Sequence, residues 1–157
     1  MTTIYLDSSA LMRRYDPREA GADSVRAICQ PRNGHDLVLV RITTVEIASA
    51  IGRKYREGQL DARARSQIWR AFISHIRDQY QVVDLNDIIY ARAEEIVCTH
   101  AVRAADAVHL ACALQTAASV TTPDFQFWTA DRRQARAVSA EGLAVRLVGA
   151  DENEFES

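Results

Sequence analysis

The sequence contains few of the residues that cross-link or interrupt a polypeptide chain. Its 157 residues include three cysteines, three prolines and six glycines. The cysteines form neither a Cys-x-x-Cys pair nor a Cys/His cluster with zinc spacing, which argues against a zinc site and a disulfide framework. We expect them to be buried free thiols of a protein in a reducing compartment, namely Cys29, Cys98 and Cys112.

Long apolar runs are also missing. No window approaches the roughly 18 consecutive apolar residues that a membrane-spanning helix needs. The first seven residues have no basic stretch and no long apolar core, so we predict no signal peptide, no membrane attachment and a cytoplasmic location. No repeat and no linker rich in Pro, Gly or Ser divides the chain, and we therefore expect a single domain over residues 1–150.

Lysine is nearly absent, because Lys54 is the single lysine among 19 basic residues. The formal net charge is −2, and four of the 21 acidic residues fall within 151–157, a short acidic tail. Residues 1–150 therefore carry a small excess of bases, nearly all of them arginine. Guanidinium groups suit phosphate oxygens, but an arginine-rich codon usage explains the ratio more simply. Composition alone does not indicate a nucleic-acid partner.

Strand-like and helical patterns alternate along the chain, which predicts an α/β domain with a mostly parallel sheet. Strands are expected at residues 3–6, 37–40, 81–85, 125–129 and 143–147. Helices are expected at residues 10–15, 19–30, 43–56, 61–77, 87–99, 104–116 and 131–141. Thr43 or Thr44 would cap the third helix, and the sixth is apolar almost all round, which places it in the core.

Two of these helices have apolar residues at helical spacing, which predicts the faces that they bury. In the helix at 43–56 the predicted inward stripe is Val45, Ala48, Ile51 and Tyr55. In the helix at 61–77 the residues expected to point inward are Ile68, Trp69, Phe72, Ile73 and Ile76.

Acidic residues occupy similar places after three of the predicted strands. Asp7 follows the first strand, Glu46 lies in the first turn of the helix after the second strand, and Asp131 lies just past the fourth. The carboxyl ends of parallel strands share one edge of the sheet, where sites form, so these carboxylates are expected to converge. Asp106 lies among alanines near the start of the buried helix, and a carboxylate so enclosed needs a strong partner.

Each acid alone has a simpler explanation. Asp7 and Asp131 could cap helices, Glu46 could interact with a helix dipole, and Asp106 could be an N-cap if its helix started later. Together, four carboxylates in one pocket would repel one another unless a cation lay among them. Oxygen ligands suit Mg²⁺ or Mn²⁺, and such an ion can activate water and stabilise a phosphodiester transition state. The predicted catalytic and metal-binding residues are therefore Asp7, Glu46, Asp106 and Asp131.

Four segments resemble, in order, the acidic motifs of PIN-domain proteins, and among these the VapC-type toxins of toxin–antitoxin pairs. They are Tyr5–Leu11, Thr44–Ala50, Arg103–Ala111 and Phe127–Asp131, and the resemblance spans about residues 3 to 148. It implies a three-layer α/β/α fold with a parallel five-stranded sheet, Mg²⁺-dependent endoribonuclease activity, dimerisation and inhibition by a small antitoxin. By this resemblance Asp7 and Asp106 are the most direct metal ligands, and Glu46 and Asp131 complete the pocket.

Several neighbouring residues have predicted supporting roles. Ser8 and Ser9 are expected to cap a helix or to hydrogen-bond a metal ligand rather than act as nucleophiles, and Thr129 matches a hydroxyl residue of the family's last motif. Arg132, Arg133 and Arg136 follow the last acid and could steer phosphates, although a solvated helix face is the default explanation for them.

Histidines and one further acid are given structural roles. His109 lies one turn after Asp106 and is expected to be a packed, hydrogen-bonded core histidine rather than a metal ligand. The other three, His35, His75 and His100, are expected at the surface. Asp124 lies near the fourth motif, and we interpret it as a turn residue rather than an active-site acid.

The predicted reaction is in-line attack of a metal-activated water on an RNA phosphodiester, which leaves a 5′-phosphate and a 3′-hydroxyl. A phosphorelay receiver would need a lysine at the sheet edge, where Lys54 does not fall. A haloacid-dehalogenase-type phosphotransferase would need Asp-x-Asp, and Ser9 takes the second position. Glycine-rich nucleotide motifs are absent from the sequence. A non-catalytic or housekeeping PIN-like RNA-binding protein stays open as the alternative.

Overall fold

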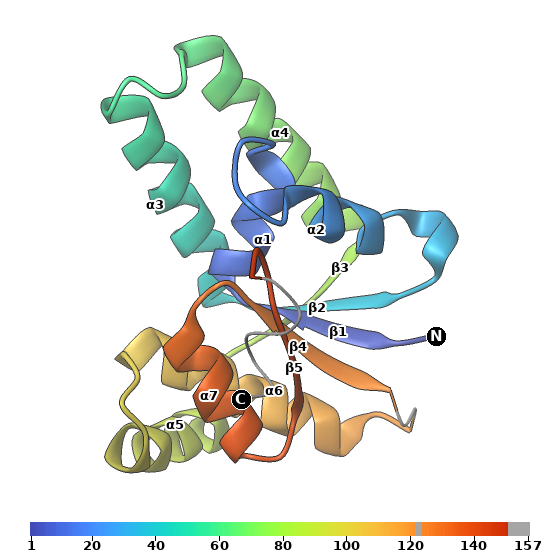
Figure 1. Cartoon of the computed structure of the whole chain (residues 1–157), viewed down its shortest axis with the longest axis vertical. Coiled ribbons are helices and arrows are strands. Elements are labelled where there is room, and N and C mark those ends of the chain that lie inside the picture. The colour runs from blue at the N-terminus through green and yellow to red at the C-terminus, as the bar shows by residue number, and fades with distance from the viewer. Residues whose placement is uncertain (122–123, 151–157) are drawn as a thin grey trace.

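The computed structural model describes residues 1–121 and 124–150, so the predicted acidic tail lies outside the described residues. A five-stranded sheet forms its centre, in the order β3-β2-β1-β4-β5 (Figure 1). Every neighbouring pair of strands is parallel. The strands are β1 (Thr3–Leu6), β2 (Asp36–Val40), β3 (Tyr80–Val83), β4 (Phe125–Thr129) and β5 (Ala144–Leu147).

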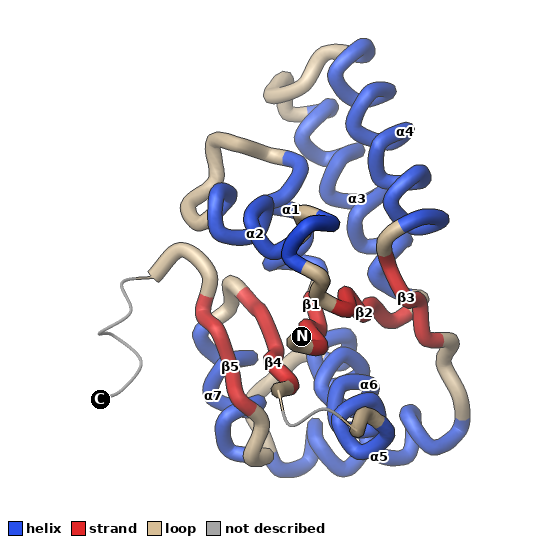
Figure 2. The backbone as a smooth tube through the Cα atoms, turned by 90° about the vertical axis from the view of Figure 1, so that its right-hand side faces the viewer, coloured by secondary structure: helices blue, strands red, loops and turns tan. Residues whose placement is uncertain are grey.

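Helices cover both faces of the sheet, which confirms the predicted three-layer α/β/α fold. The helices α1 to α4 lie on one side and α5 to α7 on the other (Figure 2). None of the helices in 1–121 and 124–150 has the length and hydropathy that crossing a membrane requires. Their bounds are α1 (Ser8–Tyr15), α2 (Ala22–Ile28), α3 (Ile42–Arg56), α4 (Ala62–Asp78), α5 (Asp87–Thr99), α6 (Ala104–Ser119) and α7 (Arg132–Ala140), with a 3₁₀ turn η1 (Pro31–Asn33).

The central strand β1 is buried on both faces. Its side chains alternate, so Ile4 and Leu6 pack into the cluster beneath α1 to α4, whereas Tyr5 packs into the cluster beneath α5 to α7. A strand that is covered on both faces has an almost continuous apolar sequence. For this reason polar and apolar residues do not alternate along β1 and β2. The parallel register brings the carboxyl ends of β1, β2 and β4 to one edge of the sheet.

Several helices begin at other residues than the sequence indicates, and α1 begins at Ser8 rather than at residue 10. The helix expected at 19–30 is the shorter α2, because Gly21 adopts a left-handed φ of 81° and starts the helix there. A Cβ on Gly21 would also lie 2.7 Å from the Gly149 nitrogen, so no larger residue fits. Helix α3 begins at Ile42 without a side-chain cap, and the predicted cap by Thr43 or Thr44 is wrong.

The buried faces of α3 and α4 also differ from prediction. Of the predicted α3 stripe Ile51 is buried, but Val45 is 66% exposed; the buried residues of α3 are Thr43, Ile47, Ile51 and Lys54. On α4, Phe72 is buried as predicted, whereas Trp69 and Ile73 are exposed. The two helices extend together beyond the sheet, so part of each apolar stripe has no core to pack against (Figure 1).

A buried ion pair explains the unexpected burial of Lys54. Its Nζ donates to Asp16 Oδ2 at 2.7 Å and to Glu19 Oε1 at 3.1 Å. Asp16 is 4% exposed, and it is the C-cap residue of α1, at the start of the segment that links α1 to α2. The hydrogen bonds of Asp16 with Arg18 and Lys54 lower the pKa of the carboxyl. The pair therefore fastens α3 to the α1–α2 connection.

Other surface expectations need correction. Cys29 and Cys112 are buried free thiols as predicted, but Cys98 is exposed on α5. The three histidines expected at the surface are half-buried instead. Tyr15 and Arg14 hydrogen-bond one of them, His75, and Glu141 hydrogen-bonds another, His100; the third is His35. The imidazoles of His75 and His100 thus pack beside polar partners that a sequence pattern does not reveal, whereas the buried Nδ1 of His35 has no hydrogen-bond partner among the described residues.

Candidate active site

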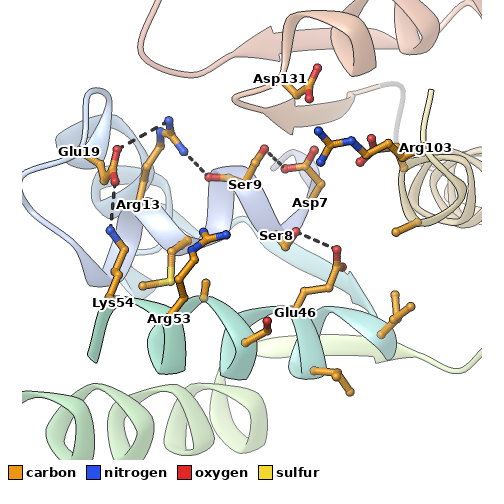
Figure 3. A pocket seen from close by; sticks show the side chains of 17 residues that line it. Asp7, Ser8, Ser9, Arg13, Glu19, Glu46, Arg53, Lys54, Arg103 and Asp131 are labelled. Carbon is orange, nitrogen blue, oxygen red and sulfur yellow. Dashed lines mark hydrogen bonds and ion pairs between the residues drawn. The ribbon is translucent and has the colours of Figure 1, made fainter. Parts of the chain in front are cut away.

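A cleft of about 640 Å³ opens at the carboxyl edge of the sheet (Figure 3). Its walls come from α1, α3, the start of α6 and the turn before α7. All four predicted acids line it, although they are up to 124 residues apart in the sequence. The full lining is Asp7, Ser8, Ser9, Met12, Arg13, Glu19, Ile42, Val45, Glu46, Ser49, Ala50, Arg53, Lys54, Arg103, Ala105, Asp106 and Asp131.

Asp7 joins the end of β1 to the start of α1. Its Oδ1 accepts hydrogen bonds from the Ala10 amide at 2.9 Å and from the Ser9 hydroxyl at 2.6 Å, so it caps α1 while it faces the cleft. The side chain is buried, and the residue is 3% exposed. Burial raises the pKa of its carboxyl, an effect that His109 and Ser9 oppose. A carboxylate in this position is stabilised by a positive charge.

Glu46 lies on α3, beyond the first turn because the helix begins at Ile42. Its Oε1 accepts a hydrogen bond from His109 Nε2 at 2.6 Å, and its Oε2 accepts one from the Ser8 hydroxyl at 3.2 Å. Both carboxylate oxygens are therefore held by groups from other elements. These two contacts fix the direction in which Glu46 enters the cleft.

His109 is completely buried on α6 and connects Glu46 to the core. Its Nδ1 shares a hydrogen bond of 2.8 Å with the hydroxyl of Tyr5, which is also fully buried. Burial alone would lower the pKa of His109, but the hydrogen bond and charge of Glu46, with the charges of Asp7 and Asp106, raise it. The imidazole is thus a hydrogen-bonded core residue, as expected, with one nitrogen directed at an acid of the cleft.

Asp106 lies in the first turn of α6 and is half-buried. Burial raises the pKa of its carboxyl, and the negative charges of Asp7, Asp131 and Glu46 raise it further. The charges of the other three acids therefore add to burial in disfavouring the ionisation of Asp106.

Asp131 combines a structural and a cleft-lining position. It caps α7 by accepting hydrogen bonds from the amides of Arg133 at 2.8 Å and Gln134 at 3.2 Å. The amide of Asp131 donates to Thr129 Oγ1 at 3.1 Å, and the Ser9 hydroxyl lies 3.3 Å from the same oxygen. Thr129 and Ser9 thus tie the end of β4 to the start of α1, between Asp7 and Asp131.

Several cleft residues have no counterpart in the sequence interpretation. Arg13, Arg53 and Arg103 line the cleft, and none of them was predicted to do so. The hydrogen bond from Ser9 to Asp7, in contrast, is of the kind that the sequence interpretation expects. Arg53 and Lys54 belong to a basic run that is visible in the sequence. The run does not indicate that Arg53 is exposed in the cleft while Lys54 is buried. Arg13 reaches the cleft through the packing of α1, which periodicity in so short a helix does not specify.

Other candidates lie outside the cleft lining. Arg132, Arg133 and Arg136 are exposed on α7, so their predicted role in phosphate steering would have to act from beside the cleft. The carbonyl of Asp124 accepts a hydrogen bond from the amide of Thr3 at the amino end of β1. Asp124 therefore lies at the opposite edge of the sheet, away from the four acids.

The donor set fits a hard divalent cation. The acids offer carboxylate oxygens, the ligands that Mg²⁺ and Mn²⁺ prefer, and burial together with the charges of its three neighbours raises the pKa of Asp106. Within 1–121 and 124–150, no three His, Cys, Asp or Glu side chains already stand as a metal-binding group. The acids surround the cleft rather than meet at a point, so a cation would have to draw them together.

A family model described as the PIN domain matches residues 4–139, and the chain therefore belongs to the PIN-domain family. This confirms the family that the four acidic segments indicate. A search of curated proteins finds no match.

Solved structures share the fold at low sequence identity. FitAcB from Neisseria gonorrhoeae is 16% identical, with a TM-score of 0.65 and coverage of 90% of this chain and 95% of that one. VapC20 from Mycobacterium tuberculosis, a toxin that cleaves the sarcin–ricin loop, is 16% identical, with a TM-score of 0.62 and coverage of 90% and 96%. VapBC2 from Rickettsia felis, bound to a DNA fragment from its promoter, is 8% identical, with a TM-score of 0.62 and coverage of 94% and 99%.

Proposed function

We propose that the chain is an endoribonuclease that depends on Mg²⁺ or Mn²⁺. The observation that carries the proposal is the cleft that Asp7, Glu46, Asp106 and Asp131 line together, in which burial and the charges of the other three acids raise the pKa of Asp106. Such a group of carboxylates is costly to keep ionised without a cation. Membership of the PIN-domain family and the fold shared with an RNA-cleaving toxin support the same activity.

In this proposal the four acids bind the cation in two different ways. Asp7 and Asp106 would be the direct ligands, while Glu46 and Asp131 complete the pocket. When bound, the ion would activate water and neutralise charge on the phosphodiester. The chain's own hydrogen bonds fix the ligands: Ser9 and the Ala10 amide orient Asp7, and His109 and Ser8 orient Glu46. Ligands held in this way lose little freedom when the metal binds.

A cognate antitoxin is the partner that we propose for this nuclease. The VapBC2 structure contains a promoter DNA fragment, which fits a toxin–antitoxin pair that regulates its own gene. The acidic cleft is complementary to an arginine side chain, because a guanidinium binds a carboxylate in a bidentate fork. An inhibitor segment carrying arginine would occupy the cleft and compete with the metal. A homodimer is the assembly we expect for the chain itself.

Cleavage of a labelled RNA tests the proposed activity. The purified chain is incubated with single-stranded RNA in EDTA, and then with Mg²⁺ or Mn²⁺ added. We expect internal cuts with metal and none in EDTA. Binding of RNA without cuts under any of these metals would instead favour the alternative, a non-catalytic PIN-like RNA-binding protein.

A further inference from the structure

The cleft is lined by basic as well as acidic side chains. Figure 3 shows Arg103 beside Asp7, and it shows Arg13 on α1 and Arg53 on α3 on the side of the cleft where Glu19 and Lys54 lie. Neither Arg13 nor Arg53 takes part in the hydrogen bonds that orient Asp7 and Glu46, which come from Ser9, Ala10, His109 and Ser8. These two cations therefore need an explanation of their own.

Arg13 is held in place by the backbone and still has donors to spare. Its Nη1 donates to the Ser9 carbonyl at 2.6 Å and its Nε donates to the Ala20 carbonyl at 3.0 Å. Its Nη2 lies 4.0 Å from Glu19 Oε2, which is beyond hydrogen-bond distance. A guanidinium has five N–H donors, so donors remain for a ligand in the cleft. A cation fixed in this way is already ordered before the ligand arrives.

Arg53 differs from its neighbour Lys54, which is buried against Asp16 and Glu19. The side chain of Arg53 is exposed, and in the described part of the chain no side chain forms a hydrogen bond or an ion pair with it. It lies seven residues after Glu46, which places the two on the same face of α3, about 10 Å apart along the helix axis. The same helix thus carries an acid at one end of the cleft and an unpaired cation at the other.

We propose that Arg13 and Arg53 form a subsite for a backbone phosphate of single-stranded RNA, beside the phosphate that is cleaved. The proposal rests on the proposed function, because it places the scissile phosphate among the acids. Four carboxylates repel a polyanion, and a guanidinium pair that binds a flanking phosphate in forked geometry offsets this repulsion. Asp7 is almost completely buried, and an unpaired strand can enter such a recess more readily than a duplex.

The salt dependence of RNA binding tests the subsite. Fluorescence anisotropy is measured with a labelled single-stranded RNA and Mg²⁺ over a range of salt, in the Asp106→Asn chain so that the RNA stays intact. Arg53→Gln is compared with Arg56→Gln, which removes the same charge one turn further along α3, outside the cleft lining. Loss of one phosphate contact flattens the slope of log K against log salt by about 0.7. We expect this change for Arg53→Gln and a much smaller one for Arg56→Gln, with Arg53→Lys in between.

The outcomes separate this proposal from the proposed function. Equal slopes for Arg53→Gln and Arg56→Gln, with RNA still bound, would overturn the subsite and leave the nuclease assignment intact. The subsite would also be overturned, and the nuclease assignment kept, if the Asp106→Asn chain bound no RNA although the wild-type chain cleaves it. If the chain neither binds nor cleaves RNA, the proposed function fails and the subsite fails with it.

Discussion

Two acids of the cleft are also the N-cap residues of helices. Asp7 and Asp131 each cap a helix and also line the cleft. The capping and the catalytic interpretations of these acids are therefore compatible, although the sequence presents them as alternatives. Asp106 has no such capping role, because Arg103 is the N-cap residue of α6. Burial and the charges of the other acids raise the pKa of Asp106, so a bound cation would favour its ionised form.

We expect Asp7→Asn and Asp106→Asn each to abolish RNA cleavage without unfolding the chain. Asparagine can still cap α1 in place of Asp7, and removal of charge from a repulsive group should leave the melting temperature of the metal-free protein unchanged or higher. Mn²⁺ should raise the melting temperature of the wild-type chain but not of the double variant. Asp124→Asn, at the opposite edge of the sheet, is the control. Wild-type turnover in either purified variant would show that its acid is not needed.

His109 is expected to set how well Glu46 binds metal. His109→Leu removes the 2.6 Å hydrogen bond to Glu46, and loss of such a partner typically weakens metal affinity by about 10- to 100-fold. His109→Gln keeps a donor and should recover part of that loss. The measurement is the Mn²⁺ concentration that gives half of the thermal shift, in variants whose metal-free melting temperatures are compared first. Equal Mn²⁺ affinities in folded His109→Leu and wild-type chains would contradict this role.

At the scale of elements, the strands were easier to predict than the helix faces. β4 (Phe125–Thr129) matches its predicted bounds, and α5 does so as well, because Asn86 caps it. The buried face of α3 was predicted only in part, because the spacing of its apolar residues fits two adjacent faces of the helix equally well. Packing selects the face that buries Lys54 with Asp16, a pairing between residues 38 positions apart that no local pattern contains.

The Asp16–Lys54 pair predicts a specific dependence of stability on pH. The pKa of Asp16 is lowered in the folded chain from about 3.9 when unfolded, so its stabilising contribution is complete above that value and is lost as pH falls through the folded pKa. Asp16→Asn should therefore lower the free energy of unfolding at pH 7 by about 3 kcal/mol. The difference should shrink as pH falls below 4. Urea unfolding at pH 7, 4 and 3 measures it, and a difference independent of pH would refute the assignment.

At the scale of the whole molecule, the parallel sheet and the convergence of four acids followed from the sequence. Strands that are apolar throughout predict a covered parallel sheet, and acids at the strand ends must share its carboxyl edge. The hydrogen-bond network of Tyr5, His109 and Glu46 could not be predicted, because it joins three elements through side-chain geometry. The arginines of the cleft were missed for the same reason.

The proposed toxin predicts an effect on the cell that makes it. Expression of the wild-type chain alone should slow growth, and the Asp7→Asn/Asp106→Asn chain should not. A small protein encoded next to the gene should restore growth and co-purify with the chain, and Asp131→Ala should weaken that complex because one carboxylate of the acidic cleft is lost. Normal growth during high expression of active enzyme would contradict the toxin and favour a housekeeping nuclease.

The central claim is that the four-acid cleft hydrolyses RNA with a divalent metal. Its most direct test is incubation of total RNA with the purified chain, with and without Mg²⁺ or Mn²⁺, followed by mapping of the cut ends. In-line attack by water predicts metal-dependent cuts with a 5′-phosphate and a 3′-hydroxyl, and none from the Asp106→Asn chain. Cuts that persist in EDTA, or that leave a 2′,3′-cyclic phosphate, would contradict the account.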